Sequence, residues 1–182
     1  MKKIRFGKTR TVYQGTIFAI EETDVLLPDG KKTVFEFCKR PPSVSVLAFN
    51  EKQEILLIQE YRYGYKHDTW FLPGGRMDHP GDTPKKAAQR ELREETGYRA
   101  KTMKLIHKKA PGNTLIWDIY IYAAKDLVHD PLPQDPGEKI TPVFVPFKTA
   151  VRMALDGTID NEFIAYNLIR FDYLLRHKLF TW

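Results

Sequence analysis

Short runs of β-branched and aromatic residues alternate with turn residues near the start of the chain. Residues 16–20, 25–27 and 33–37 are rich in Ile, Val, Phe and Thr, which favour strands. Residues 28–30, Pro-Asp-Gly, separate two of these runs and are typical of a tight turn. The pattern predicts an antiparallel N-terminal β unit between residues 11 and 36.

Two consecutive prolines then interrupt the chain. Proline has no amide hydrogen to donate, so Pro41 and Pro42 cannot continue a strand ladder. The apolar runs at residues 44–49 and 55–60 follow, joined by a polar turn, and predict the next pair of strands. We therefore expect residues 1–40 to form an N-terminal β unit and residues 41–182 to form the main domain.

One helix carries clear signals at both ends. Thr83 can accept a hydrogen bond from a free amide at the helix start, and Pro84 suits the first helical position because its missing amide costs nothing there. Gly97 is the residue best able to adopt the left-handed conformation that ends a helix. We expect a helix over residues 85–96.

The rest of the chain predicts two strands, one long loop and two more helices. The strands are expected at residues 103–107 and 115–123. Between Asp130 and Pro142, four prolines, one glycine and three acids predict a loop of a length often associated with function. Helices are expected at residues 147–155 and from about residue 162 to 177. Strands first, one helix in the middle and helices last is an α+β pattern.

Composition narrows the class of protein. A chain of 182 residues is long enough for one domain with a small appendage, and its apolar runs are far shorter than the roughly 18 residues of a membrane span. The single cysteine, Cys38, fits a reducing compartment, so we expect a cytoplasmic protein. The formal net charge of +6 favours anionic partners. Because the basic residues are spread along the chain, nucleic acid is not the expected partner.

The helix over residues 85–96 places three carboxylates together. At 100° per residue, Glu95 lies about 40° from Glu91 on one side and Glu94 about 60° from it on the other. Like charges at this spacing repel, and a hard divalent cation such as Mg²⁺ removes the repulsion. A solvated acidic face neutralised by neighbouring arginines is the alternative. A Gly-Gly loop before the helix lets backbone approach a ligand closely and favours the metal site.

This segment resembles the box of the Nudix hydrolase family, in which Gly, five residues, Glu and seven residues precede Arg-Glu-apolar-x-Glu-Glu-x-Gly-apolar. The second half matches completely, at Arg90, Glu91, Leu92, Glu94, Glu95, Gly97 and Tyr98. The first half differs twice, since six residues separate Gly75 from the acid and that acid is Asp82. His79 looks like the inserted residue.

The resemblance implies roles for these residues. Glu91 and Glu95 are implied as ligands of Mg²⁺ or Mn²⁺, with Glu94 as a third ligand or helper. Arg90 is implied as the partner that orients Glu94, and the carbonyl of Gly74 as a further metal ligand. The family's fold, a mixed sheet between helices with the box as loop, helix and loop, is expected by the same likeness.

Most of residues 33–165 also resembles the branch that acts on ADP-ribose and other nucleoside diphosphate sugars. The branch implies a homodimer whose N-terminal β unit crosses to the partner, and hydrolysis of the pyrophosphate to a nucleoside monophosphate and a sugar phosphate. Candidate substrate-binding residues are Glu36, Arg40 and Arg62. Glu138 is the candidate general base, with Asp135 as the alternative; an exposed loop glutamate is the plainer interpretation of Glu138.

Two other functions stay open. A Nudix-like module could bind a nucleotide or RNA without cleaving it, but the complete set of box carboxylates argues against this. A Nudix enzyme could cleave a nucleoside triphosphate or a dinucleoside polyphosphate, but such a domain has little use for the long N-terminal unit.

Several aromatic residues could stack a nucleotide base: Tyr13, Phe18, Tyr61, Tyr63 and Trp70. Aromatic residues at strand spacing are more often part of the core, so none is assigned to the base.

Overall fold

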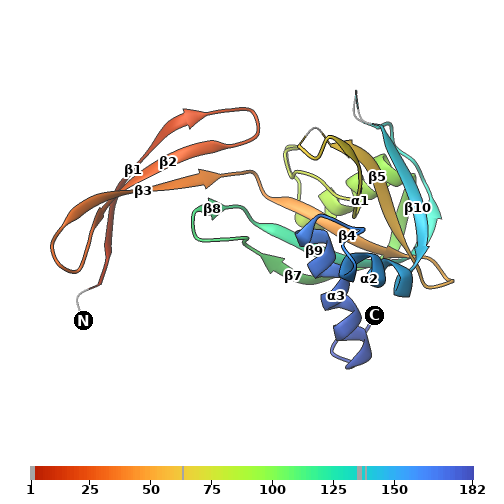
Figure 1. Cartoon of the computed structure of the whole chain (residues 1–182). Helices are drawn as coiled ribbons and strands as arrows, with labels where there is room; N and C mark the ends of the chain where they lie inside the picture. The colour runs from red at the N-terminus through yellow and green to blue at the C-terminus, as the bar shows by residue number, and fades with distance from the viewer. Residues whose placement is uncertain (1–2, 63, 135–136, 138) are drawn as a thin grey trace.

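The computed structural model describes residues 3–62, 64–134, 137 and 139–182, which form two sheets and three helices (Figure 1). A four-stranded sheet has the order β1-β2-β3-β8, and a six-stranded sheet has the order β10-β5-β4-β9-β7 with β6 paired to β5. The strands are β1 (Arg5–Gln14), β2 (Ala19–Leu26), β3 (Lys32–Lys39), β4 (Ser43–Phe49), β5 (Glu54–Arg62), β6 (His67–Phe71), β7 (Tyr98–Lys109), β8 (Leu115–Ile116), β9 (Ile119–His129) and β10 (Ile140–Pro146). The helices are α1 (Pro84–Thr96), α2 (Phe147–Leu155) and α3 (Glu162–Arg176).

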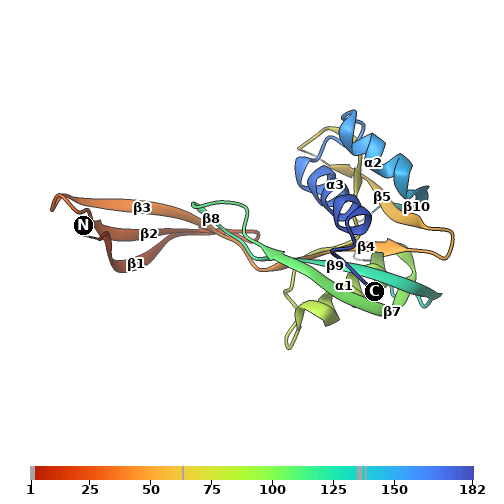
Figure 2. The same ribbon diagram turned by 90° about the horizontal axis from the view of Figure 1, so that it is seen from below.

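The four-stranded sheet forms an arm that extends away from the rest of the molecule (Figures 1 and 2). Strands β1, β2 and β3 are antiparallel, as the sequence predicts, and the two-residue β8 adds to β3 in parallel. The prediction missed β1 because all ten of its residues are exposed, so it carries no buried alternation. The strand predicted at residues 16–20 is wrong in its start: the amide of Gly15 donates to the carbonyl of Phe18 in a turn, and β2 begins only at Ala19.

The six-stranded sheet lies between α1 on one face and α2 with α3 on the other (Figure 2). Every residue of β4 is buried, and its side chains alternate between the two layers. Val44, Val46 and Ala48 pack in the cluster that includes Leu92 of α1. Leu47 and Phe49 pack in the cluster that includes residues of α2 and α3. The sheet is mixed, since β4 pairs in parallel with β9 and antiparallel with β5, so the predicted α+β class with a mixed sheet between helices is confirmed.

The helices follow their sequence signals closely. The side chain of Thr83 accepts from the amide of Lys86 at 3.3 Å, and Gly97 ends α1 with φ of 77°. The bounds of α2 agree with the prediction, and α3 ends one residue before His177. Within the described residues, no helix is both long and apolar enough to cross a bilayer.

The later strands differ from the prediction. Strand β7 is longer than residues 103–107, and the strand expected at residues 115–123 is interrupted at Trp117, so its two parts, β8 and β9, join different sheets. Strand β10 replaces the last part of the predicted loop. It tolerates Pro142 because it lies at the edge of the sheet, where a missing amide donor breaks no ladder on the open side.

Candidate active site

The glycine loop is fixed to the sheet on one side and to α1 on the other. The amides of Val46 and Val44 donate to the carbonyls of Pro73 and Gly75 at 2.8 and 2.9 Å. The amide of the intervening Gly74 points the other way and donates to Glu95 Oε2 at 2.7 Å. Glu95 is only 4% exposed. This charge-assisted bond therefore holds a buried carboxylate in one orientation against the loop.

A side chain at either glycine of the loop would meet close contacts. A Cβ on Gly74 would stand 2.2 Å from the carbonyl oxygen of Val44, and its φ of 152° is one that other residues rarely adopt. A Cβ on Gly75 would stand 2.5 Å from Glu91 Oε2. The missing side chain at Gly75 thus leaves the space that the Glu91 carboxylate occupies.

Arg90 organises the other carboxylates of α1. Its Nη1 atom lies 2.8 Å from Glu94 Oε2 and 3.0 Å from Glu91 Oε1. Its Nη2 atom donates to the carbonyl of Arg76 at 3.0 Å. Burial alone would lower the pKa of Arg90, but the neighbouring carboxylates outweigh it and raise the pKa above its usual value. Arg90 is therefore a permanent cation that fixes two side chains of the box and the loop before it.

The extra residue in the box is absorbed by a turn. The amide of Asp82 donates to the carbonyl of His79 at 3.1 Å, and Gly81 adopts a positive φ of 77°. Asp82 Oδ2 still lies 3.5 Å from Arg90 Nη2. The insertion and the shorter acid therefore leave Asp82 within reach of the arginine.

Several carboxylates gather at this site. Asp82, which precedes α1, and Glu91 and Glu94 of α1 surround the guanidinium of Arg90, and Glu95 is the third carboxylate on that helix. Excess negative charge on partly buried groups is costly without a cation. The oxygen atoms of carboxylates such as Glu91, Glu94 and Glu95 suit a hard ion such as Mg²⁺. In the described part of the chain, no group of three His, Cys, Asp or Glu side chains is already arranged to hold a metal ion. Glu91 and Glu94 pair with Arg90, and Glu95 accepts a hydrogen bond from the Gly74 amide. The donor chemistry fits the metal that the box implies.

The three predicted substrate-binding residues lie in different places. Arg40 lies between the arm and the six-stranded sheet, and its guanidinium carbon stands 4.2 Å from the ring centre of Trp117. Arg62 ends β5, where it pairs with Glu60 at 2.6 Å and covers the ring of Phe71 at 4.9 Å. Glu36 is exposed on β3 of the arm, opposite Glu22 of β2. The structure does not bring Glu36 to the carboxylates of α1 within one chain.

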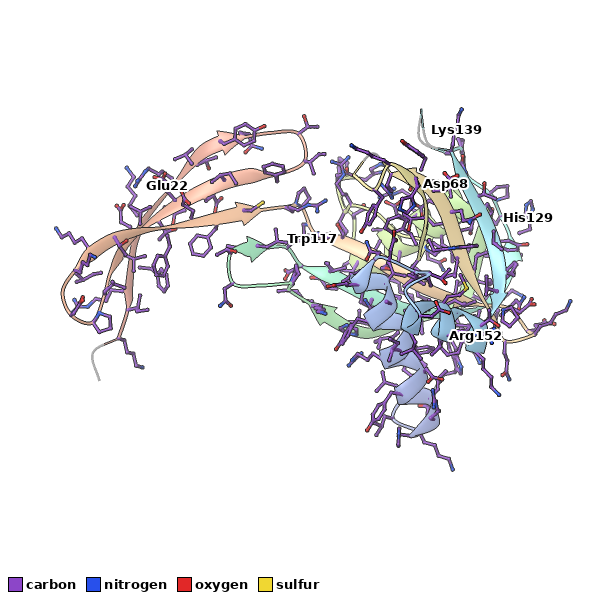
Figure 3. The ribbon with its side chains drawn as sticks, viewed as in Figure 1. Glu22, Asp68, Trp117, His129, Lys139 and Arg152 are labelled. Carbon is purple, nitrogen blue, oxygen red and sulfur yellow. The ribbon has the colours of Figure 1, made fainter. Side chains whose placement is uncertain are left out.

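The predicted base and its alternative, Glu138 and Asp135, lie outside the described residues, as does Tyr63. The loop leaves the sheet after β9 and returns at Ile140, which pairs with Glu60. Figure 3 shows Lys139 at the same end of the sheet as Asp68 of β6. The loop therefore returns beside the strand end that carries Arg62.

Two residues that contact the candidate substrate-binding arginines were not identified from the sequence. Glu60 pairs with Arg62, and burial raises its pKa despite the nearby guanidinium. Trp117 supports Arg40 and was hidden by the single long strand expected around it. The sequence contained a signal for Glu60, because a carboxylate two positions before Arg62 in a strand can pair with it. It contained no signal for Trp117, which is far along the chain from Arg40.

Comparison with known proteins identifies the family. A family model described as the NUDIX domain matches residues 39–166. The ADP-ribose pyrophosphatase of Mycobacterium tuberculosis is 31% identical over 158 residues, covering 85% of this chain and 76% of that protein. The methanol dehydrogenase activator of Bacillus methanolicus is 30% identical over 121 residues, covering 66% of this chain and 65% of that protein.

A solved structure agrees over nearly the whole chain. The crystal structure of an ADP compounds hydrolase superposes with a TM-score of 0.80 at 26% identity and covers 97% of each chain. The likeness therefore includes the arm as well as the domain that contains the box. The chain belongs to the Nudix hydrolase family, in the branch whose relatives include ADP-ribose pyrophosphatases.

Proposed function

We propose that this Nudix hydrolase is a metal-dependent enzyme that cleaves the pyrophosphate bond of ADP-ribose or another nucleoside diphosphate sugar. The observation that carries the proposal is the group of α1 carboxylates, Glu91, Glu94 and Glu95, held against the Gly74–Gly75 loop. The relative named ADP-ribose pyrophosphatase and the structure of an ADP compounds hydrolase support this substrate class. The products are a nucleoside monophosphate and a sugar phosphate.

The residues proposed to hold Mg²⁺ or Mn²⁺ are Glu91, Glu94, Glu95 and the carbonyl of Gly74. When bound, the cation would neutralise charge on the diphosphate and polarise its P–O bonds. Arg90 keeps Glu91 and Glu94 oriented, and the Gly74 amide keeps Glu95 oriented, so these side chains need little rearrangement.

The remaining steps belong to the protein's own side chains. Arg40 and Arg62 are proposed to bind the diphosphate and the adjoining sugar, since guanidinium groups suit phosphate oxygens. Glu138 is proposed to take a proton from the attacking water. The water oxygen bonds to one phosphorus as the bridging P–O bond breaks, and the leaving phosphate takes the electron pair of that bond.

We further propose that residues 1–40 dimerise the protein and that residues 41–182 are the hydrolase domain. The family match begins at residue 39, which supports this boundary. In a homodimer, Glu36 on the arm would serve the site of the partner subunit. The single cysteine of the chain supports a cytoplasmic location.

The test is phosphate release, with added phosphatase, over a panel of nucleoside diphosphate sugars, dinucleotides and triphosphates. The assay is run with Mg²⁺, with Mn²⁺ and with chelator. We expect ADP-ribose or another nucleoside diphosphate sugar to be cleaved only with metal. Preference for a triphosphate or dinucleoside polyphosphate would replace the proposed substrate. A protein inert on the whole panel would be a binding module.

A further inference from the structure

The Arg40 side chain is held on an aromatic surface at the base of the arm. Its guanidinium carbon lies 4.2 Å from the ring centre of Trp117, which is within the range of a cation–π interaction. The backbone amide of Arg40 donates to the carbonyl of Ile116 at 3.0 Å, so both backbone and side chain contact the segment that contains Trp117. Figure 3 shows Trp117 where the arm joins the six-stranded sheet.

Trp117 is itself fixed to the sheet that carries the glycine loop. Its Nε1 atom donates to Ser43 Oγ at 2.9 Å. The next residue, Val44, donates its amide to Gly75. One continuous set of contacts therefore connects Arg40, Trp117, the first residues of β4 and the loop against which the α1 carboxylates lie.

The charge of Arg40 has no protein counterion within residues 3–62, 64–134, 137 and 139–182. No carboxylate of this part of the chain forms an ion pair with it, and its Nε atom is buried without a hydrogen-bond partner. A buried donor on a cation is costly to leave unsatisfied. Arg62 differs, because Glu60 already neutralises it at 2.6 Å. Of the two arginines, Arg40 is the one whose charge is available to an anionic ligand.

We infer that Trp117 is a positioning residue that holds the Arg40 guanidinium ready for the diphosphate of the substrate. This inference rests on the proposed function, because it assigns Arg40 to substrate binding. Besides its packing on the hydrophobic core, Trp117 contacts Arg40 and Ser43, and among the described residues it forms no ring contact or hydrogen bond with a proposed metal ligand. Trp117 is therefore expected to act on affinity and not on the chemical step. Without the indole, the long arginine side chain samples many rotamers and must be ordered again by each substrate molecule.

The test measures Trp117→Leu, Arg40→Gln and the double variant with ADP-ribose and metal. Trp117→Leu should raise KM about tenfold and leave kcat within about twofold. In the Arg40→Gln background, Trp117→Leu should add less than about twofold to KM, because the side chain that Trp117 is proposed to position is already removed. Isothermal titration of ADP without metal gives a second readout, and the Kd should follow the same pattern.

Two further variants keep the test informative if the leucine variant folds poorly. Trp117→Phe keeps an aromatic ring but loses the bond to Ser43, and Ser43→Ala removes the acceptor; each should raise KM by a smaller factor than Trp117→Leu. Trp182→Leu is the matched control, since Trp182 also lies under a cation, Lys125 at 5.1 Å, but contacts neither Arg40 nor β4 residues 43–44. It should leave KM unchanged.

The two hypotheses fail in different ways. A wild-type protein that cleaves nothing on the substrate panel contradicts the proposed function. An active wild type in which the effects of Trp117→Leu and Arg40→Gln on KM multiply contradicts the inference, because Trp117 would then act independently of Arg40. A fall in kcat with unchanged KM would contradict it as well.

Discussion

At the scale of single residues, the site depends on side chains whose orientation is set by the backbone. The carboxylate of Glu95 accepts a hydrogen bond from the Gly74 amide. The backbone at Gly74 lies so close to the Val44 carbonyl that a residue with a Cβ atom would clash there. The sequence predicts that Glu91, Glu94 and Glu95 share a helix face. It does not predict this bond, because the contact depends on where the loop crosses β4.

Replacing Glu95 tests the metal site with little structural disturbance. Glu95→Gln keeps an oxygen that can accept the Gly74 amide but removes a charge, so we expect kcat to fall by at least about 10²-fold, given that metal catalysis supplies several kcal/mol. Relief of repulsion among the carboxylates should keep or raise the metal-free melting temperature. Activity assays and thermal unfolding are compared with Glu51→Gln, an exposed turn residue. Wild-type turnover in Glu95→Gln would contradict the assignment.

Replacing Glu138 tests the proposed base. Glu138→Gln removes the proton acceptor while keeping the shape of the side chain, so kcat should fall by about 10²-fold or more with little change in KM. Steady-state kinetics of this variant and of Asp135→Asn decide between the two carboxylates. Unchanged turnover in Glu138→Gln together with a loss in Asp135→Asn would transfer the role to Asp135.

His107 gives a prediction about stability and pH. Burial, together with Arg170 and Lys109, lowers its pKa from 6.5 to about 4. Arg170 Nη1 donates to Nδ1 at 2.7 Å, which requires the neutral ring. As the pH falls, the His107 ring is protonated in the unfolded chain before it is protonated in the folded protein. The stability contributed by neutral His107 is therefore complete above pH 6.5 and is lost as the pH falls from 6.5 towards 4.

The variant His107→Asn should flatten this pH dependence, because its amide oxygen can accept from Arg170 without titrating. After allowance for solvent screening, the wild type should lose about 1–2 kcal/mol more than the variant between pH 7 and pH 4.5. Urea unfolding at both pH values measures the difference. His79→Asn, in an exposed loop, is the control and should behave like the wild type. Parallel pH curves for wild type and His107→Asn would show that another group is responsible.

At the scale of elements, local chemistry predicts the helices better than the strands. Thr83, Pro84 and Gly97 define α1 from neighbouring residues alone, and the structure confirms these ends. Strands β8 and β10 have no comparable local signal. β8 is two residues long and exists because β3 lies beside it, and β10 contains two prolines that only an edge strand accepts.

The carboxylate of Asp130 connects three elements at the start of the loop between β9 and β10. Asp130 follows β9 and lies 3.0 Å from both Arg93 of α1 and Arg99 of β7 through its two carboxylate oxygens. Its carbonyl also accepts Arg93 Nε at 2.9 Å. The start of the loop that carries Glu138 in the sequence is therefore attached to the helix that carries the carboxylates.

Removing this attachment should affect both stability and turnover. For Asp130→Ala we expect the free energy of unfolding to fall by about 1 kcal/mol, since two partly exposed ion pairs are lost. We expect kcat to fall severalfold with KM little changed, because the loop loses its fixed start. Asp156→Ala is the control, because it removes the carboxylate that accepts hydrogen bonds from the amide and hydroxyl of Thr158 after α2. It should lose similar stability and keep kcat; equal kcat in both variants would contradict a role for Asp130 in the loop.

At the scale of the whole molecule, the arm leaves an unusual amount of apolar surface exposed. The exposed large apolar side chains on the arm are Ile4, Phe6, Val12, Tyr13, Ile17, Phe18, Val34, Phe35 and, on β8, Ile116. A few strands have little stability of their own unless their apolar face packs on another surface, and these side chains are exposed in the single chain. So many exposed apolar side chains on one part of a molecule favour an interaction site there. The sequence predicts the arm's composition and its need for a partner, but not the direction in which it extends.

The arm therefore gives the last prediction, which is a homodimer at micromolar concentration. Phe6 is 63% exposed and stands edge-to-face with Phe35 at 6.3 Å, so replacing both with Ser should weaken any interface that covers them. We expect light scattering to give twice the chain mass for the wild type and a lower average mass for Phe6→Ser/Phe35→Ser. Leu155→Ser is the control, because Leu155 is also exposed, at 69%, but lies at the end of α2. A monomeric wild type with full activity would show that the arm serves another partner, and loss of the dimer in Leu155→Ser would move the interface to the helical face.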